Sequence, residues 1–167
     1  DLARPNITAA TTLASAADIA VALLNDQPLP AVENEVSCDD LTMLQNACQS
    51  LPVHRQAIRG VFAGGTFCYE AQLICQQKGF HAASNTPVAG NRALANIWQS
   101  EDHTLIDMGD DDLTRGKPHP MIDPTLRNQR LLNELNDSHT AVVLFDLVLG
   151  YGTSATPVSE LLDQLSH

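Results

Sequence analysis

Three apolar segments, each followed by a glycine and then by a helical pattern, constrain the fold of this chain more than any other feature. They span 58–63, 104–108 and 141–149. Strands that alternate with helices are joined by right-handed crossovers and build a parallel sheet. The third segment is nearly continuously apolar, which is typical of a strand covered on both faces. The pattern predicts an α/β fold, a flavodoxin-like or Rossmann-like three-layer arrangement around a parallel sheet.

Helix start and stop signals supply the other elements. The predicted helices run from Thr12 to about Asn25, from Ser37 or Asp39 to about Gln49, from Thr66 to Gly79, from Asp123-Pro124 to about Leu135, and onward from Pro157 or Val158. Residues 7–10 form a candidate strand. Residues 81–101 are predicted as a loop with one or two helical turns near 92–98.

The charge balance excludes two classes of partner. The 167 residues include 9 Lys and Arg against 20 Asp and Glu, a formal net charge of −11. Nucleic acid and anionic membranes need a cationic face, so neither is an expected partner. No apolar run approaches the roughly 18 residues of a membrane span, and no signal peptide opens the chain. The four cysteines form no CxxC pair and are predicted as buried thiols, so we expect a cytoplasmic location.

Two glycine-containing loops follow the first and third segments and are candidate anion sites. They consist of Gly64, Gly65 and Thr66 in one case, and of Gly150, Tyr151, Gly152 and Thr153 in the other. A strand that turns directly into a helix presents free N–H groups and the positive end of the helix dipole. Two such loops at neighbouring strand ends can converge on one anion. The alternative interpretation is a tight turn in the first case and a flexible turn in the second.

A charged segment, 106–124, precedes the helix that starts at Asp123-Pro124. Its carboxylates include the weak Mg²⁺ candidates Asp110 and Asp111, because Mg²⁺ takes one or two carboxylates together with substrate phosphate. The alternative is a solvated acidic loop, and we assign no metal site. Arg115 and Lys117 offer a cationic rim for an anion.

His119 is the candidate catalytic residue of this segment. Pro118 and Pro120 flank it and restrict the backbone on both sides, whereas a phosphohistidine needs a mobile, glycine-rich loop. Three interpretations stay open: a structural histidine whose ring bonds a backbone carbonyl and orders the loop, a contact to an anion or substrate, and a covalent phosphoryl carrier. Asp146 either pairs with a neighbour inside the third apolar segment or points to the ligand.

Three strings carry a family resemblance. They are RGVFAGGTFCYEAQ at 59–72, IDMGDDDLTRGKPHPMIDP at 106–124 and VVLFDLVLGYG at 142–152. In this order, and over about 55–155, the chain resembles the FdrA family, which is related to NDP-forming acyl-CoA synthetases such as succinyl-CoA synthetase. The resemblance implies the second of two flavodoxin-like CoA-ligase domains, whose helix N-termini face a shared phosphate site. Gly64–Thr66 match one helix start and Gly150–Thr153 match the other strand-end loop.

The resemblance also implies a domain organisation. Residues 1–35 are similar to the last strand and helix of a preceding ligase domain with its linker, and 36–167 to a ligase domain. In that family the ligase domain continues with two further strands after the helix that here ends near His167. The glycine-flanked histidine loop of the synthetases has no counterpart in this sequence. A sheet of this kind exposes an edge, so we expect a homo-oligomer or partner subunits; residues 7–10 or a second copy would cover the edge.

The function implied is that of a subunit that binds a phosphate-bearing ligand: an acyl phosphate, carbamoyl phosphate or CoA. The corresponding reactions are acyl-CoA synthesis or, in purine and allantoin breakdown, oxamate carbamoyl transfer with partner subunits. CoA, or a nucleotide with Mg²⁺, is the implied cofactor. The alternative is a non-catalytic assembly module of a larger enzyme. A plain nucleotide-binding domain is less favoured, because no dinucleotide fingerprint is present.

Overall fold

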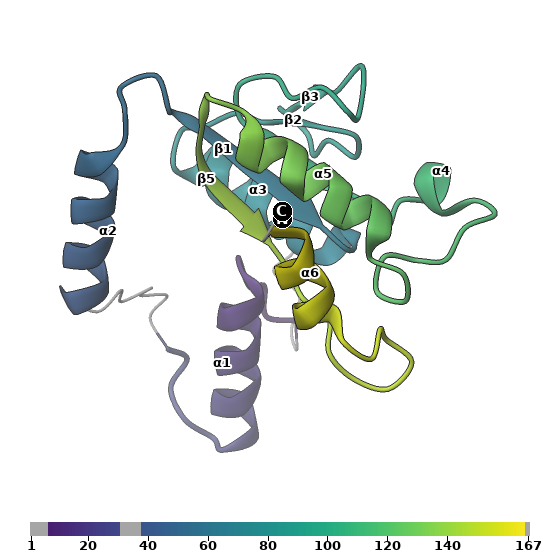
Figure 1. The fold of residues 1–167 in the computed structure, drawn as a ribbon. Helices are drawn as coiled ribbons and strands as arrows, with labels where there is room; N and C mark the ends of the chain where they lie inside the picture. The colour runs from purple at the N-terminus through teal and green to yellow at the C-terminus, as the bar shows by residue number, and fades with distance from the viewer. Residues whose placement is uncertain (1–6, 31–37, 166–167) are drawn as a thin grey trace. The chain divides into compact units, whose positions relative to one another are not determined.

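The computed structural model describes residues 7–30 and 38–165. The chain divides into two compact units, Asp1–Ser50 and Leu51–His167, which are coloured in sequence order in Figure 1. In the described residues, no helix is both long and apolar enough to cross a membrane.

The described residues of the first unit form two helices, α1 (Leu13–Leu24) and α2 (Cys38–Ser50). Thr12 is the N-cap of α1 as predicted, and it forms a capping box with Ser15: the Ser15 N–H donates to Thr12 Oγ1 at 3.1 Å, and the Thr12 N–H donates to Ser15 Oγ at 3.0 Å. Residues 7–10 form no strand, so this prediction was wrong. They lack a ladder partner and lead directly into the cap.

The second unit is built on a sheet of five parallel strands in the order β3-β2-β4-β1-β5. The strands are β1 (Ala57–Phe62), β2 (Ala83–Ser84), β3 (Arg92–Ala93), β4 (Thr104–Asp107) and β5 (Thr140–Phe145). The helices are α3 (Gly65–Gln77), α4 (Asp111–Thr114), α5 (Thr125–Asn136) and α6 (Pro157–Leu165). The predicted α/β fold with a parallel sheet is therefore confirmed.

Alternate side chains of the central strands build a separate core on each face of the sheet. Val61 and Ile106 pack with Leu131 and Leu161, from α5 and α6. On the opposite face, α3 contributes to the second core, which consists of Phe62, Cys68, Cys75, Ala82 and Leu105. Figure 1 shows α5 and α6 in front of the sheet and α3 behind it. The unit thus has three layers.

The third apolar segment is an edge strand, contrary to the prediction that both of its faces are covered. In the described part of the chain, β5 pairs with β1 alone. Val143 packs into the core, but Val142 and Leu144 are 47% and 40% exposed. The reason is that α3 packs over β1 and β4 and leaves this face of β5 open. The resulting α3–β5 groove is lined mainly by Phe62, Phe67, Ala71, Ile74, Leu144 and Phe145.

Two further expectations need correction. The predicted helical turn near 92–98 is absent, because backbone groups there bond to β2: the Arg92 N–H donates to the Ala82 carbonyl at 3.2 Å and the Leu94 N–H to the Ser84 carbonyl at 2.8 Å. Cys68 and Cys75 are buried free thiols as expected, and burial raises the pKa of the Cys68 thiol to about 11. Cys48, however, is exposed on α2.

Candidate functional site

The strand order places a topological switch point between β1 and β5. From β1 the chain passes through α3 to β2, β3 and β4, which all lie on one side of β1, and α5 then leads it back to β5 on the other side. In open parallel sheets, ligands bind at the carboxyl ends of the strands beside such a point. We call this end of β1, β4 and β5 the carboxyl edge; it is the candidate functional site.

The N-terminus of α3 lies at the carboxyl edge without a side-chain cap. Its N-cap is Gly64, in extended conformation with φ −165° and ψ 167°. Thr66 is exposed in the first helical turn, so its prediction as the cap was wrong: the helix already begins at Gly65. A Cβ on Gly64 would meet no atom within 4 Å. The backbone here is open to an approaching anion, and the first N–H groups of a helix favour one.

Asp107 ends β4 and points its carboxyl group at this helix start. Its Oδ1 accepts the Gly109 N–H at 2.8 Å, while Oδ2 lies 3.0 Å from the point that a Cβ of Gly65 would occupy. Desolvation raises the pKa of Asp107; the Gly109 N–H and the electrostatic effect of His119 lower it, and the charges of Asp110 and Asp146 raise it. The protonated acid is therefore favoured more than in an exposed aspartate.

Asn85 holds the backbone of Asp107 in place. Its side-chain amide donates to the Asp107 carbonyl at 2.8 Å, and its side-chain oxygen accepts the Asp107 N–H at 2.9 Å. Sequence reasoning did not identify Asn85, because it follows β2, a strand of only two residues that has too few positions for a readable pattern. The one feature of the sequence that could have pointed to Asn85 is its position as a polar residue directly after Ala82-Ala83-Ser84, which the structure shows to be buried.

His119 lies beside the same edge with a defined ring orientation. Its Nδ1 accepts the Met121 N–H at 3.2 Å, so the neutral ring carries its proton on Nε2. A Cβ on Gly109 would lie 2.5 Å from Nε2 and 2.4 Å from the Ala63 carbonyl oxygen. The Nε2–H group is thus close to the residue that precedes Gly64. The ring therefore bonds the backbone through an N–H group and not through the predicted carbonyl, and this bond leaves Nε2 at the site.

Asp146, which follows β5, is paired with the backbone. Its Oδ1 accepts the Ala63 N–H at 2.7 Å, and its carbonyl accepts from the buried Arg127 guanidinium at 2.8 Å. Desolvation lowers the pKa of Arg127, and the Asp146 charge opposes this effect. Of the two interpretations for Asp146, pairing with a neighbour describes its contacts. Arg127 was not identified from the sequence, since a cation on a helix is usually solvated.

The loop Gly150–Thr153 is tied to the segment of His119. Its Thr153 hydroxyl donates to the Gly150 carbonyl at 2.8 Å, and the next residue, Ser154, donates its N–H to the Met121 carbonyl at 2.8 Å. Tyr151 is fully exposed. Convergence of this loop and the α3 N-terminus on one anion stays a prediction.

Arg115 and Lys117 line a separate hollow of about 450 Å³. Trp98, Met108 and Leu126 contribute apolar walls to it. Both cations are exposed, and Arg115 forms a solvent-facing ion pair with Asp112 at 3.4 Å. Their predicted role as an anion rim stays a prediction.

The acidic candidates Asp110 and Asp111 belong to α4. Asp110 is the N-cap, and its carboxylate accepts the Asp112 N–H at 3.0 Å. Asp111 is exposed in the first turn. Within 7–30 and 38–165, no group of three or more His, Cys, Asp or Glu side chains is arranged to hold a metal ion.

Comparison with known proteins identifies the family. The CoA-ligase family model matches residues 61–167, which include the carboxyl end of β1, α3 and the whole carboxyl edge. Among curated proteins, the uncharacterized protein YahF of Escherichia coli (strain K12) is 42% identical over 117 residues. That match covers 70% of this chain but 23% of YahF, so the chain spans about a quarter of this relative. Membership of the FdrA family stays a prediction, and the chain belongs to the CoA-ligase family.

Proposed function

We propose that the carboxyl edge binds the phosphate group of an acyl phosphate, carbamoyl phosphate or CoA. The observation that carries the proposal is the uncapped start of α3 at the switch point, with open space in front of Gly64. Free N–H groups and the helix dipole stabilise an anion there by about 0.3–1 kcal/mol at a surface, and by up to about 2 kcal/mol when it is partly buried.

Asp107 and His119 fit such a ligand as proton donors. Asp107 can donate only while its carboxyl group is protonated, and burial raises its pKa in that direction. A bound phosphate raises it further, because a second anion disfavours ionisation. The Nε2–H of His119 provides another donor near Ala63. Both groups can hydrogen-bond phosphate oxygens or supply a proton as the phosphate leaves an acyl or carbamoyl group.

The reaction proposed is a ligase-type acyl transfer: acyl-CoA synthesis or carbamoyl transfer to oxamate. Both acyl phosphate and carbamoyl phosphate present a phosphate on an activated carbonyl, so one phosphate site serves either reaction. CoA or a nucleotide with Mg²⁺ would meet this edge through its phosphates. Because the chain spans only part of YahF, the complete reaction is proposed for the chain together with other domains or partner subunits.

We do not assign a covalent phosphohistidine to this function. The His119 ring is oriented by the Met121 N–H and lies close against Gly109, and prolines flank it. A carrier would have to swing between two sites. Incubation with acetyl phosphate or labelled nucleotide should leave no acid-labile phosphate on the protein. His119→Asn should weaken ligand binding moderately, and a stoichiometric phosphohistidine at this position would restore the carrier interpretation.

The decisive experiment is calorimetry with phosphate, acetyl phosphate, carbamoyl phosphate and CoA on the wild type and Gly64→Ala. The added methyl group enters open space, so the fold should persist while affinity falls about tenfold, or 1.4 kcal/mol. Gly65→Val tests the site less cleanly, since its Cβ would also press on Asp107 Oδ2. The absence of binding by all four ligands, or equal binding by Gly64→Ala, would contradict the proposal.

The two lysines of the chain provide a matched pair for the cationic rim. Lys117 lines the hollow beside α4, whereas Lys78 is the C-cap of α3, at the opposite end from the candidate site. If the rim contributes, Lys117→Ala should weaken binding and Lys78→Ala should not. If both variants weaken binding equally, the cause is the general loss of positive charge, and Lys117 has no specific role in the rim.

The second candidate function is that of an assembly module, and the exposed α3–β5 groove favours it. Leu144 and Phe145 are 40% and 43% exposed beside the unpaired edge of β5. Two copies of one chain present the same groove and edge to each other, as a two-fold interface requires. This function predicts a dimer in light scattering that Leu144→Lys dissociates, and full turnover in Gly64→Ala. Loss of turnover in Gly64→Ala would favour the first proposal.

A further inference from the structure

We propose that the opposite, amino edge of the sheet carries a second binding site, for a small organic oxyanion. A cavity of about 600 Å³ lies there, within the usual range for small-molecule sites, about 300–1,000 Å³. It is lined by residues that precede or begin the strands, such as Ala57 of β1, His103 before β4 and His139 before β5. Nothing in the function proposed above uses this edge.

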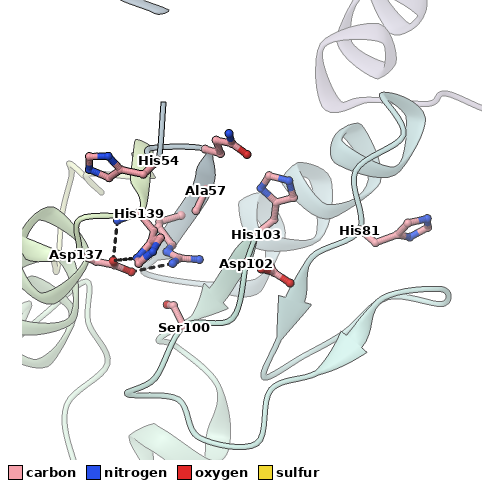
Figure 2. A pocket seen from close by; sticks show the side chains of 10 residues that line it. His54, Ala57, His81, Ser100, Asp102, His103, Asp137 and His139 are labelled. Atoms are coloured by element: carbon pink, nitrogen blue, oxygen red, sulfur yellow. Dashed lines mark hydrogen bonds and ion pairs between the residues drawn. The ribbon is translucent and has the colours of Figure 1, made fainter. Parts of the chain in front are cut away.

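The cavity concentrates histidine. Four of the six histidines in the chain line it: His54, His81, His103 and His139. Figure 2 shows His54 and His139 on one side and His103 on the other, whereas His81 points away from them. Two of these rings form hydrogen bonds within the protein: His103 Nδ1 with the Ile58 N–H, and His139 Nδ1 with Asp137 Oδ1 at 3.3 Å.

His103 presents a proton to this space. Its Nδ1 accepts the Ile58 N–H at 3.1 Å, and Phe80 packs edge-on against the ring with the centroids 5.1 Å apart. The backbone bond leaves the proton of the neutral ring on Nε2. His103 is therefore a donor whose orientation is determined before any ligand binds.

Arg59 supplies an unpaired buried donor. The side chain is 3% exposed; its Nε forms an ion pair with Glu134 at 2.8 Å, and its Nη2 forms one with Asp137 at 2.8 Å. In the described structure its Nη1 is buried and has no hydrogen-bond partner. A buried donor without an acceptor is costly. Because Arg59 lines the cavity, a turn of its guanidinium toward this space would bring Nη1 to an acceptor oxygen of a bound ligand.

Two carboxylates also line the cavity, and they limit the negative charge of any ligand that binds there. Asp137 is already engaged by Arg59 and by the His139 N–H at 2.9 Å. Asp102 is 87% exposed and lies 3.6 Å from Arg92. Neither is bonded to Nη1 of Arg59 or to Nε2 of His103. Their charges disfavour a polyanion, so the site suits one phosphate or carboxylate group on a small organic body.

The test is a titration of the full chain with inorganic phosphate and, separately, with malonate, followed by imidazole NMR. His54 and His103 should show saturable shifts with at least one probe, with a dissociation constant of about 1 mM or lower. Saturation by phosphate alone assigns a phosphate group, and saturation by malonate alone assigns a carboxylate. His119 reports the carboxyl edge separately, so failure of one site is distinguishable from failure of the other.

Three variants complete the test. His103→Asn keeps an acceptor for the Ile58 N–H but loses the Nε2 donor, and should weaken binding about tenfold. His54→Ala, at an exposed position, should also weaken binding and covers the case in which His103→Asn unfolds. Asp163→Asn, on α6 and outside the cavity lining, is the control and should bind as wild type. If neither probe shifts His54 and His103, or if all three variants bind alike, the second site does not exist.

Discussion

At the scale of single residues, the carboxyl edge depends on how closely backbone segments approach one another. Gly109 lies between the end of β1 and the ring of His119, where a Cβ would be 2.4 Å from a backbone oxygen and 2.5 Å from Nε2. Gly64, in contrast, has room for a Cβ. Glycine thus has a packing role at 109, whereas at 64 it leaves a space that the fold does not use.

Gly109→Ala should therefore destabilise the protein, whereas Gly64→Ala should not. Overpacking costs about 1–3 kcal/mol, and the Ala63 carbonyl cannot move without shifting the end of β1. A substitution into open space usually changes stability by less than about 0.5 kcal/mol. Urea denaturation of both variants measures the difference. Equal stabilities would mean that the segment of His119 moves aside without cost.

Buried charge is the second determinant at this scale. Glu134 is 1% exposed and forms ion pairs with Arg59 and Arg130, while Ser100 bonds both Glu134 and Arg130. Desolvation lowers the pKa of Arg130, and the Glu134 charge opposes this effect. The network holds the end of α5 against β1.

Glu134→Gln should leave two buried guanidinium groups without their shared counter-charge. Removal of one partner from a buried pair costs about 3–5 kcal/mol. The matched control is Glu101→Gln, because Glu101 pairs with Arg92 at the surface and surface pairs contribute about 0–1 kcal/mol. Thermal unfolding of both variants tests this prediction, and similar melting temperatures would refute it.

At the scale of elements, the sequence predicted those whose signals are local. The cap of α1, the strand β1, the glycine break before α3 and the start of α6 each depend on a few adjacent residues. The exposure of β5 was not predictable in this way, because its apolar pattern is the same in a central strand and in an edge strand with one open face. The pairing of β2 with β3 was missed since each strand has two residues.

The candidate site was predictable to a similar extent. Gly64 and Gly65 were identified because a strand-to-helix turn with glycine has a local signature. Asn85 and Arg127 act through contacts with residues 19–22 positions away in the chain, and spacing in one sequence contains no record of such contacts. His119 was identified, but its ring orientation depends on the fold of the loop.

The C-terminal end of α5 should make stability sensitive to acid. Asp137 is its C-cap; the His139 N–H and then Arg59 lower the pKa of this carboxyl to about 2. Because an unfolded aspartate titrates near 3.9, this stabilisation is complete above about pH 5 and is lost as the pH falls towards 2. Asp137→Asn should lower the free energy of unfolding at neutral pH. It should also reduce the fall of this free energy between about pH 5 and pH 2, as measured by urea denaturation at several pH values. The control Asp163→Asn, on α6, should leave this pH dependence of the free energy of unfolding unchanged.

At the scale of the whole molecule, the chain consists of two compact units with unequal roles. Both core clusters, the carboxyl edge and the amino-edge cavity consist of residues from Leu51–His167 alone. The predicted boundary near residue 35 separates a segment similar to the end of a preceding ligase domain from the ligase domain itself. This division stays a prediction. In the structure, all residues of the two proposed binding sites lie in the second unit.

A fragment of residues 51–167 should therefore fold and bind as the full chain does. It keeps both cores, and domains with their own core usually fold alone. We expect one cooperative thermal transition, and carbamoyl phosphate affinity within about threefold of the full chain, less than 1 kcal/mol. A fragment of residues 51–156 is the control, because it loses Leu161, which is 4% exposed in the core beneath α6; loss of a buried leucine costs about 2–5 kcal/mol. If the longer fragment unfolds, the first unit is needed for stability; if it folds but fails to bind while the full chain binds, the first unit contributes to the site.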